Sequence, residues 1–571
     1  MTGPTTSPAP AARDLDVAPG DAADRLVEIL PPGDARVPDA AHCVTGALLA
    51  TRAKAHPDRV YAVFEDGTHW TYGQAHDDAR ATAAALHRLG VRQGDTVLCW
   101  LPNGLDALRV WYGVNLLGAV HVPVNTAYRG ALLEHVLGNS GARVLVVHAQ
   151  LVERLQHIGA GRLQEVVVLG GGPDAPWPDA LPGAPRVHGP AALRGLPEDF
   201  VPPERPVAPW DTMAVIYTSG TTGPSKGVLV SYVHHYSTVT ALLDDDIGED
   251  DRYLLNLPLC HGGGTEVAYC MLLFGGSIVV TENFRTGEFW DVVRRHGVTM
   301  CTLLGAMVDF LLGLAPRPDE AEHPLRAACV IPLTRQALDF GRRFGVDVYT
   351  GFNMSETSAP LVSPLNPRRT GSCGRPRPGV QCRVVDAYGI DVPDGSVGEL
   401  VLRADRPWSL FHGYHAMPEA TAAAWRHGWF RTGDAVVREP GGDYFFVDRI
   451  KDAIRRRGEN VSSMEVEAEL LSHPAVAHAA AVAVPSDFAE DEILAALVLR
   501  PGARFDPEEF IGYLRPRMAH FMVPRYLRVL SELPVTDTGK VRKETLRAQG
   551  VTPDTWDRVA AGIEVTRDRV R

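Results

Sequence analysis

The segment Ile216 to Ser231, IYTSGTTGPSKGVLVS, concentrates residue types that bind phosphate. It follows an apolar run typical of a strand, and it places three glycines, several hydroxyl side chains and one lysine in a short loop. Glycines let backbone N–H groups approach an anion, hydroxyls donate hydrogen bonds, and Lys226 supplies a mobile positive charge. The loop is not a Walker loop, because Ser225 precedes Lys226 where that pattern requires glycine. Taken alone, it could also be an ordinary surface turn.

Four other strings carry side chains that suit phosphate chemistry. They are GFNMSE, which ends at Glu356, GWFRTGD, which ends at Asp434, DRIKDAIRRRGEN, and PVTDTGKVRK, which contains Lys540. A carboxylate can bind a cation or accept hydrogen bonds from two hydroxyls, and a mobile lysine can neutralise phosphoryl charge. Each residue alone has an ordinary alternative, since Asp434 could be a turn residue and Lys540 a surface charge.

Together, in this order from Cys43 to Lys543, these strings resemble the adenylate-forming superfamily of acyl-CoA synthetases, peptide-synthetase adenylation domains and luciferases. The resemblance implies an enzyme that uses ATP and Mg²⁺ to join an organic acid to AMP, with coenzyme A as the expected acceptor. A carboxylate is a poor electrophile, so it first attacks the α-phosphorus of ATP and expels pyrophosphate, which makes AMP the leaving group. Catalysis of this kind depends mainly on positioning and electrostatic stabilisation.

The resemblance also assigns roles to individual residues. Glu356 and Thr218 would hold the magnesium, Lys540 would bridge the acid and the α-phosphate, and Lys451 would be a hinge. Asp434 would accept both ribose hydroxyls, Arg449 would reach the ribose or phosphate, and Gly458 would line the tunnel for the thiol. The expected nucleotide and coenzyme contacts are Thr218, Ser219, Gly220, Thr221, Thr222, Lys226, Phe352, Asn353, Met354, Ser355, Asp434, Arg449 and Gly458. The expected catalytic residues are Lys540, Glu356, His261 and Lys226.

The string PLCHGGGTE indicates the pocket for the acid. The resemblance puts His261 in the passage between acid and thiol, with a purely structural histidine as the alternative. Gly263 leaves space, and Glu266 introduces a carboxylate where many fatty-acid members are apolar, which favours a substrate with an amine or hydroxyl. ACVIPLTRQ and GENVSS are similar to the branch of carnitine and crotonobetaine CoA ligases, which resembles bacterial ATP-dependent diazotases.

Composition narrows the class of protein. The chain has 571 residues, 45% hydrophobic and 22% charged, which provides core for one large domain and at least one smaller one. The formal net charge is -13 and basic residues are dispersed, so nucleic acid is not an expected partner. The eight cysteines lack CxxC or zinc spacing and are expected to be reduced. The start lacks a signal-peptide pattern and the uncharged stretch 110–124 is too short to span a bilayer, so we expect a cytoplasmic protein without membrane contact.

The pattern along the chain predicts three parts. Residues 1–40 are rich in Pro, Ala, Gly and Asp and are expected to form a loose tail. In residues 41–447, β-rich runs such as TVLCW and GSIVV alternate with helical stretches such as GQAHDDARATAAALHRLG. We therefore expect a large α/β domain of layered sheets with a small β-barrel-like part. Residues 448–571 predict a small α+β lid domain, which the resemblance makes mobile about Lys451.

The leading functional hypothesis is an acid–CoA ligase that acts on a small polar or aryl acid as a monomer or homodimer. The alternative is an ATP-dependent diazotase of secondary metabolism, in which nitrite replaces the carboxylate and the nitrosyl adenylate is attacked by an arylamine. The two differ in their need for coenzyme A and for nitrite. An idle scaffold is disfavoured because Lys226, Glu356 and Lys540 are all present, and a peptide-synthetase module because no carrier-domain motif follows.

Overall fold

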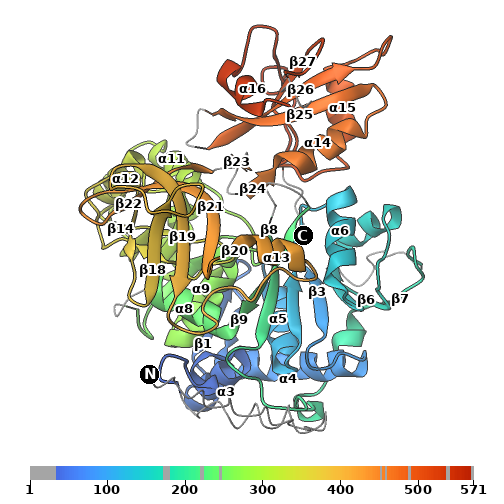
Figure 1. Cartoon of the computed structure of the whole chain (residues 1–571). Coiled ribbons are helices and arrows are strands. Elements are labelled where there is room, and N and C mark those ends of the chain that lie inside the picture. The colour runs from blue at the N-terminus through green and yellow to red at the C-terminus, as the bar shows by residue number, and fades with distance from the viewer. Residues whose placement is uncertain are drawn as a thin grey trace, which may run out of the picture.

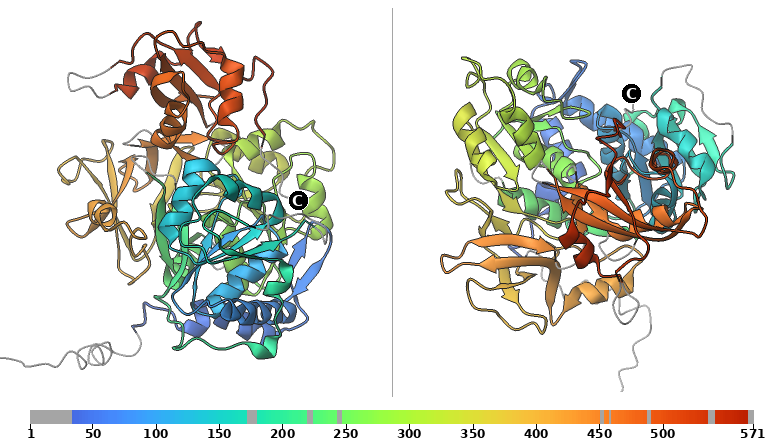
Figure 2. Two further views of the ribbon diagram at one scale, coloured as in Figure 1. Left: turned by 90° about the vertical axis from the view of Figure 1, so that its right-hand side faces the viewer. Right: turned by 90° about the horizontal axis from the view of Figure 1, so that it is seen from above.

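The structure is a computed structural model, and it describes residues 34–171, 180–218, 224–242, 247–449, 453–456, 459–486, 490–534 and 541–566. Within these ranges the side chains of residues 448, 449, 453, 460, 462 and 464 lie outside the description. The larger part of the chain builds three sheets with their helices, and a smaller C-terminal part lies at one end of this body (Figure 1). The side view in Figure 2 shows the same division, and in the view from above the C-terminal part lies over the larger body.

The first sheet carries the predicted phosphate-binding loop. Its order is β7-β6-β5-β3-β4-β8-β9, and all neighbours pair in parallel except β8 and β9. Every residue of β5 and β6 is buried, as expected for valine-rich strands of a sheet that is covered on both faces. The strands are β3 (Thr96–Trp100), β4 (Val120–Pro123), β5 (Val144–His148), β6 (Glu165–Leu169), β7 (Arg186–His188), β8 (Thr212–Thr218) and β9 (Lys226–Ser231).

The second sheet has the order β14-β13-β12-β10-β11-β1-β2, parallel except for the pair β1 and β2. Its strands are β1 (Val60–Phe64), β2 (His69–Thr71), β10 (Arg252–Leu255), β11 (Ser277–Val280), β12 (Met300–Leu304), β13 (Ala327–Ile331) and β14 (Asp347–Tyr349). Three helices of this region are α10 (Phe289–His296), α11 (Gly305–Leu312) and α12 (Arg335–Phe344). Crossover helices between parallel strands confirm the α/β alternation that the sequence predicts.

A layer of helices separates the two large sheets. Helix α5 packs on β3 and β4, α9 packs on β10 and β11, and α3 contacts both α5 and α9. Helix α4 begins with a capping box, in which the Gln74 backbone N–H donates to Thr71 Oγ1 and the Thr71 backbone N–H donates to Gln74 Oε1. The α-helices of this part are α2 (Ala40–Cys43), α3 (Thr45–Ala55), α4 (Tyr72–Arg88), α5 (Leu105–Leu116), α6 (Gly130–Ser140), α7 (Ala149–Val152), α8 (Tyr232–Leu242) and α9 (Gly262–Phe274). Three 3₁₀ helices are η1 (Glu153–His157), η2 (Pro190–Leu193) and η3 (Pro197–Asp199).

The third sheet is antiparallel and corrects one expectation. Its order is β15-β16-β17-β22-β21-β19-β18, with β20 paired to β21, so in the described residues the path does not close and the expected β-barrel-like part is an open sheet. Strands β15 and β16 contain two residues each, which is too short to complete a ring. The elements are β15 (Gly351–Phe352), β16 (Leu361–Val362), β17 (Ser372–Pro376), β18 (Val380–Val385), β19 (Val397–Ala404), α13 (Pro418–Ala424), β20 (Trp425–Arg426), β21 (Trp429–Arg438) and β22 (Tyr444–Arg449).

The C-terminal part combines a hairpin, a mixed sheet and three helices, which confirms the predicted smaller α+β unit. The hairpin consists of β23 and β24, and the sheet has the order β25-β26-β27-β28. The elements are β23 (Ala453–Arg456), β24 (Glu459–Ser462), α14 (Ser463–Leu471), β25 (Val476–Pro485), β26 (Asp491–Leu499), α15 (Pro507–Leu514), β27 (Tyr526–Val529), α16 (Lys543–Gln549) and β28 (Trp556–Asp557). The predicted tail falls outside the described residues up to residue 33.

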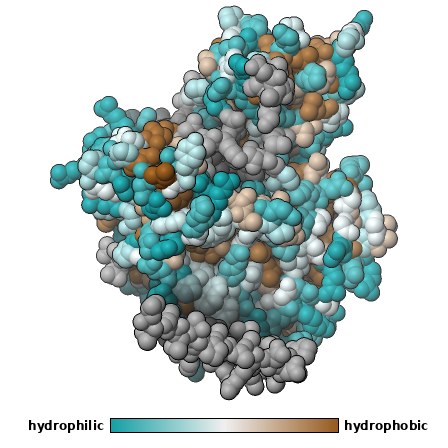
Figure 3. Space-filling view, in the orientation of Figure 1, coloured by the Kyte–Doolittle hydropathy of each residue, from teal (hydrophilic) through white to brown (hydrophobic). Residues whose placement is uncertain are grey.

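The face of the protein drawn in Figure 3 is mostly hydrophilic, as expected when the apolar side chains fill a layered core. On this face hydrophilic side chains cover most of the surface and hydrophobic ones are scattered between them. Among the helices that the structure describes, none has the length and apolar character that crossing a bilayer requires.

Candidate active site

The ends of the predicted phosphate loop lie at one point of the first sheet. Thr218 ends β8 and Lys226 begins β9, and the two residues are paired across the antiparallel ladder. The Ser225 hydroxyl donates to the Thr218 carbonyl at 3.0 Å, which holds the returning strand against the outgoing one. The predicted phosphate contacts Ser219, Gly220, Thr221 and Thr222 lie between them, outside the described residues.

Tyr414 links the lysine of this loop to the predicted magnesium carboxylate. The Lys226 ammonium lies 4.7 Å from the centroid of the Tyr414 ring, a distance typical of a cation–π contact. The hydroxyl of the same ring donates to Glu356 Oε1 at 2.9 Å, and Glu356 is buried. The structure therefore brings Lys226 and Glu356, which are far apart in sequence, to the same aromatic side chain, Lys226 at its ring and Glu356 at its hydroxyl.

A cavity of about 1160 Å³ adjoins these residues. Asp434 also lines it, from the middle of β21, where its side chain is buried. The neighbouring strand β22 places Arg449 directly across from Asp434 in the ladder, and the Arg449 side chain is outside the description. The residues of the predicted set that line this cavity are Thr218, Lys226, Phe352, Asn353, Met354, Ser355, Glu356 and Asp434.

A second cavity, of about 800 Å³, contains the residues predicted for the acid pocket. It is lined by His261, Gly263 and Glu266 from the start of α9, and by apolar and aromatic side chains of the second sheet. Four residues of the segment 351–355, Gly351, Asn353, Met354 and Ser355, line both cavities. One short segment thus forms a common wall between the predicted nucleotide site and the predicted acid site.

His261 sits where the larger and smaller parts of the protein meet. It is the N-cap residue of α9, and its Nε2 lies 2.7 Å and 2.9 Å from the two carboxylate oxygens of Glu459 on β24. Asn125 Nδ2 donates to the same carboxylate at 3.1 Å. Burial disfavours the protonated imidazole, but Glu459 and Cys260 together outweigh burial and raise the pKa of His261 well above its usual value. The pair is therefore an ion pair at neutral pH.

Glu266 is a second carboxylate in the acid cavity. Asn353 Nδ2 donates to Glu266 Oε1 at 3.0 Å. Burial raises the pKa of Glu266 to about 7, and the Asn353 hydrogen bond offsets only part of this increase. A carboxyl group with such a pKa changes charge readily in response to what occupies the cavity.

A third cavity, of only about 80 Å³, shares His261 and Glu459 with the acid pocket. It is lined by Tyr128, Thr218, Glu459 and Glu465 among others. Burial raises the pKa of Glu465 to about 8, although hydrogen bonds from Ser225 partly oppose the increase. The predicted tunnel residue Gly458, the hinge Lys451 and the catalytic Lys540 lie outside the described residues.

Sequence reasoning missed three residues of this site. Glu459 follows the predicted Gly458 directly, so its position beside a functional glycine was a usable signal. Asn125 and Tyr414 lie in no string with recognisable spacing, and only the fold brings them to His261 and Lys226. Their roles are a consequence of tertiary packing.

Comparisons with known proteins agree with this geometry. Relatives include a sulfoacetate–CoA ligase from Cupriavidus necator, 34% identical over 87% of this chain and 96% of that protein. A crotonobetaine/carnitine–CoA ligase from Salmonella arizonae is 29% identical over 86% of this chain and 96% of that protein. The structure of an o-succinylbenzoate CoA synthetase from Bacillus subtilis, bound to a product analogue, is similar with a TM-score of 0.75 and 25% identity, covering 88% of this chain and 98% of that one.

The family comparison covers both parts of the molecule. The model of the AMP-binding enzymes matches residues 49–415, and the model of the AMP-binding enzyme C-terminal domain matches residues 465–540. The first match includes Lys226, His261 and Glu356, and it spans more than half of the chain. The chain therefore belongs to the AMP-binding enzyme family.

Proposed function

We propose that this chain is an acid–CoA ligase that uses ATP and Mg²⁺ to activate a small polar or aryl carboxylic acid as its acyl adenylate. The observation that carries the proposal is the wall that residues 351–355 form between two cavities. One cavity contains the cationic, acidic and hydroxyl groups that a nucleotide triphosphate needs, and the other is mostly apolar. An acid and an α-phosphate can meet only where such cavities adjoin.

In the first step the carboxylate oxygen of the acid attacks the α-phosphorus, and pyrophosphate leaves. Lys226, Thr218 and the loop residues Ser219, Gly220, Thr221 and Thr222 would hold the phosphates. Asp434 would accept hydrogen bonds from the ribose hydroxyls, and Arg449 would reach the ribose or phosphate. Lys540 would bridge the acid and the α-phosphate, neutralising charge as it develops.

The residues present are compatible with a magnesium ion. The described residues contain no group of three or more His, Cys, Asp and Glu side chains that could hold a metal by themselves. Magnesium at nucleotide sites is usually held by one or two carboxylates together with substrate phosphates. Glu356, which is buried and accepts a hydrogen bond from Tyr414 beside Lys226, fits that role, and Thr218 would be the second protein ligand. When bound there, the ion would neutralise phosphate charge.

In the second step the thiol of coenzyme A attacks the acyl carbon, AMP leaves and the thiol proton is released. Glu459 of β24 contacts His261, so this residue is suitably near for an acceptor-side role, and Gly458 precedes it in the sequence. We propose the domain boundary near residue 448 with its hinge at Lys451, so that Lys540 serves the first step and the hairpin β23–β24 the second. The CoA ligase names of the relatives support the thiol acceptor.

A second candidate is the ATP-dependent diazotase. The observation in its favour is the small acceptor-side cavity, about 80 Å³, which carries the carboxyl groups of Glu459 and Glu465. Such a narrow acidic space suits a small acceptor better than a long pantetheine arm. In this reaction nitrite attacks the α-phosphorus and pyrophosphate leaves. An arylamine nitrogen then attacks the nitrosyl nitrogen and AMP leaves, and the resulting protonated N-nitrosamine loses water to give the diazonium ion.

Product analysis separates the two candidates. Purified enzyme with ATP, Mg²⁺ and a panel of acids is assayed with coenzyme A or with nitrite, and the products are identified by mass. A thioester and AMP support the ligase. AMP release that requires nitrite and is indifferent to coenzyme A replaces the ligase with the diazotase.

A further inference from the structure

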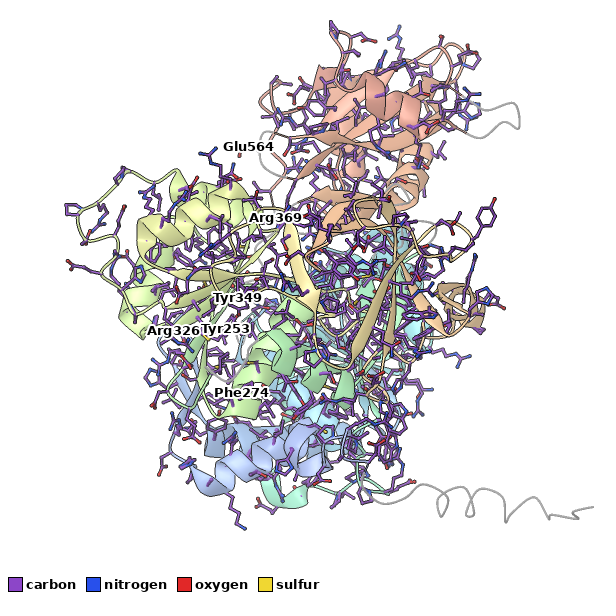
Figure 4. All side chains as sticks on the ribbon, turned by 60° about the vertical axis from the view of Figure 1, so that its left-hand side comes forward. Tyr253, Phe274, Arg326, Tyr349, Arg369 and Glu564 are labelled. Atoms are coloured by element: carbon purple, nitrogen blue, oxygen red, sulfur yellow. The ribbon has the colours of Figure 1, made fainter. Side chains whose placement is uncertain are left out.

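Glu266 places a carboxyl group inside a cavity whose neighbouring walls are mostly apolar. The cavity is lined by Val239, Leu242, Val267, Ile331 and Met307, among others. Two tyrosines, Tyr253 and Tyr349, lie close together in its wall, and Figure 4 labels both in the interior of the larger part. A carboxyl group in such surroundings is costly unless its oxygens find partners.

The protein supplies only part of what this carboxyl group can accept. Asn353 donates one hydrogen bond, and its amide orientation is fixed because Asn353 Oδ1 accepts from the Ala359 backbone N–H at 2.8 Å and from Thr357 Oγ1 at 3.1 Å. Among the described residues no lysine, arginine or histidine forms an ion pair with Glu266, and no basic group contributes to its pKa. An ionised carboxylate has about four acceptor positions, so most of its capacity faces the cavity.

The helix start leaves room for this carboxyl group. A Cβ atom at Gly262 would lie 2.9 Å from Glu266 Oε1, so a larger residue at position 262 would displace the side chain. Arg285, a basic residue on the same cavity, is already paired with Glu288 and Glu65. His261, Arg455, Arg456 and His520 also line this cavity, and none of these described residues forms an ion pair with Glu266. Glu266 therefore presents an acceptor that no basic side chain of the described residues neutralises.

We propose that Glu266 receives an amino group of the organic acid, so that the preferred substrate is an amino-substituted aryl acid. The inference rests on the proposed ligase function. Asn353, the hydrogen-bond partner of Glu266, lines both the acid cavity and the nucleotide cavity. An acid whose amine meets Glu266 can therefore direct its carboxylate to the junction of the two cavities. The N–H groups donate to Glu266, the ring contacts the tyrosines, and the carboxylate faces the nucleotide cavity.

The proposal is tested with pairs of aryl acids in which a methyl group replaces the amino group that donates the hydrogen bond. ATP–pyrophosphate exchange is measured with 3- and 4-aminobenzoate and with 3- and 4-methylbenzoate, which have nearly the same size but no N–H. We expect kcat/KM to be roughly 10- to 100-fold higher for the better of the two aminobenzoates than for the methylbenzoate substituted at the same position. Glu266→Met should reverse this preference by lowering kcat/KM for the aminobenzoate and raising it for the methylbenzoate.

The matched control is Glu288→Gln, because Glu288 pairs with Arg285 but does not line the cavity. In this variant the ratio of kcat/KM for the aminobenzoate to kcat/KM for the methylbenzoate should equal that of the native enzyme. Equal kcat/KM for both acids in the native enzyme, or a preference that survives in Glu266→Met, overturns the inference while the ligase function stands. No exchange with any of these acids counts against the proposed function itself and removes the basis of the inference.

Discussion

His261 and Glu459 form an ion pair across the junction between the two parts of the protein, with Nε2 2.7 Å from the nearer carboxylate oxygen. His261 begins helix α9 of the larger part, whereas Glu459 begins strand β24 of the C-terminal hairpin. The pair lines both the cavity of about 800 Å³ and the cavity of about 80 Å³. Its formation therefore depends on how the C-terminal part is docked, and we propose that it serves the acceptor step.

Removing one partner should impair the second step more than the first. In Glu459→Gln the imidazole loses its counter-charge, so we expect thioester formation to fall at least about tenfold, the effect of losing one charged hydrogen bond. ATP–pyrophosphate exchange, which reports only the first step, should change by less than about threefold. Asp554→Asn, at an exposed pair with Arg528 in the same part, is the control. Equal losses in both assays would show that the pair does not act in the acceptor step.

The sequence predicts much of the fold because its signals are local. The runs TVLCW and GSIVV became β3 and β11, and the helical stretch after residue 72 became α4. The antiparallel third sheet was harder to predict, since β15, β16 and β20 contain two residues each, too few to show an alternating pattern, and are defined only by their pairing with other strands. Closure into a barrel depends on such pairing, which explains why the expected barrel-like part proved to be an open sheet.

The residues of the candidate site also fall into two groups, those that the sequence predicts and those that it does not. Lys226, Glu356, His261 and Asp434 stand in strings whose composition indicates chemistry, and the structure places them around adjoining cavities. Tyr414 between Lys226 and Glu356, and Asn125 beside Glu459, are single residues without a local pattern. Their positions follow from packing between segments far apart in the chain, which one sequence does not reveal.

Two lysines near the C-terminus should behave in opposite ways. Lys540→Ala should lower ATP–pyrophosphate exchange by at least about 100-fold and leave the melting temperature unchanged, because its proposed role is to stabilise transition-state charge. Lys543 donates to Ser463 and pairs with Glu467, each at 2.7 Å, so Lys543→Ala should lower the free energy of unfolding by about 2 kcal/mol. Both variants are measured by scanning calorimetry, which reports stability, and by ATP–pyrophosphate exchange, which reports the first step. Near-native exchange in Lys540→Ala would contradict the assignment.

Asp434 should determine nucleotide affinity. In Asp434→Ala both acceptors for the ribose hydroxyls are lost, so the Kd for ATP should rise roughly tenfold or more. Titration calorimetry with ATP is the direct measurement. The control variant is Asp443→Ala. Asp443 lies in the turn between β21 and β22 and forms an ion pair with Arg375 of β17. Unchanged ATP affinity in Asp434→Ala would place the ribose elsewhere.

Glu465 should make stability depend on pH. Burial raises the pKa of Glu465 to about 8, so the folded state retains a proton that the unfolded chain releases near pH 4.5. The stabilising contribution of this proton is complete below pH 4.5 and is lost as the pH rises through about 8. Glu465→Gln should therefore melt at nearly the native temperature at low pH and increasingly above it toward pH 8. The other titratable groups around this cavity are Tyr128, Tyr217, His261 and Glu459. A melting-temperature difference that does not change with pH would contradict the assigned cause.

The most direct test of the whole account is the identity of the product formed by the native enzyme. Purified protein is incubated with ATP, Mg²⁺, an aminobenzoate and either coenzyme A or nitrite, and the products are identified by mass spectrometry. The account predicts AMP, pyrophosphate and an aminobenzoyl thioester in the presence of coenzyme A, with no requirement for nitrite. AMP formation that requires nitrite and proceeds without coenzyme A would contradict it.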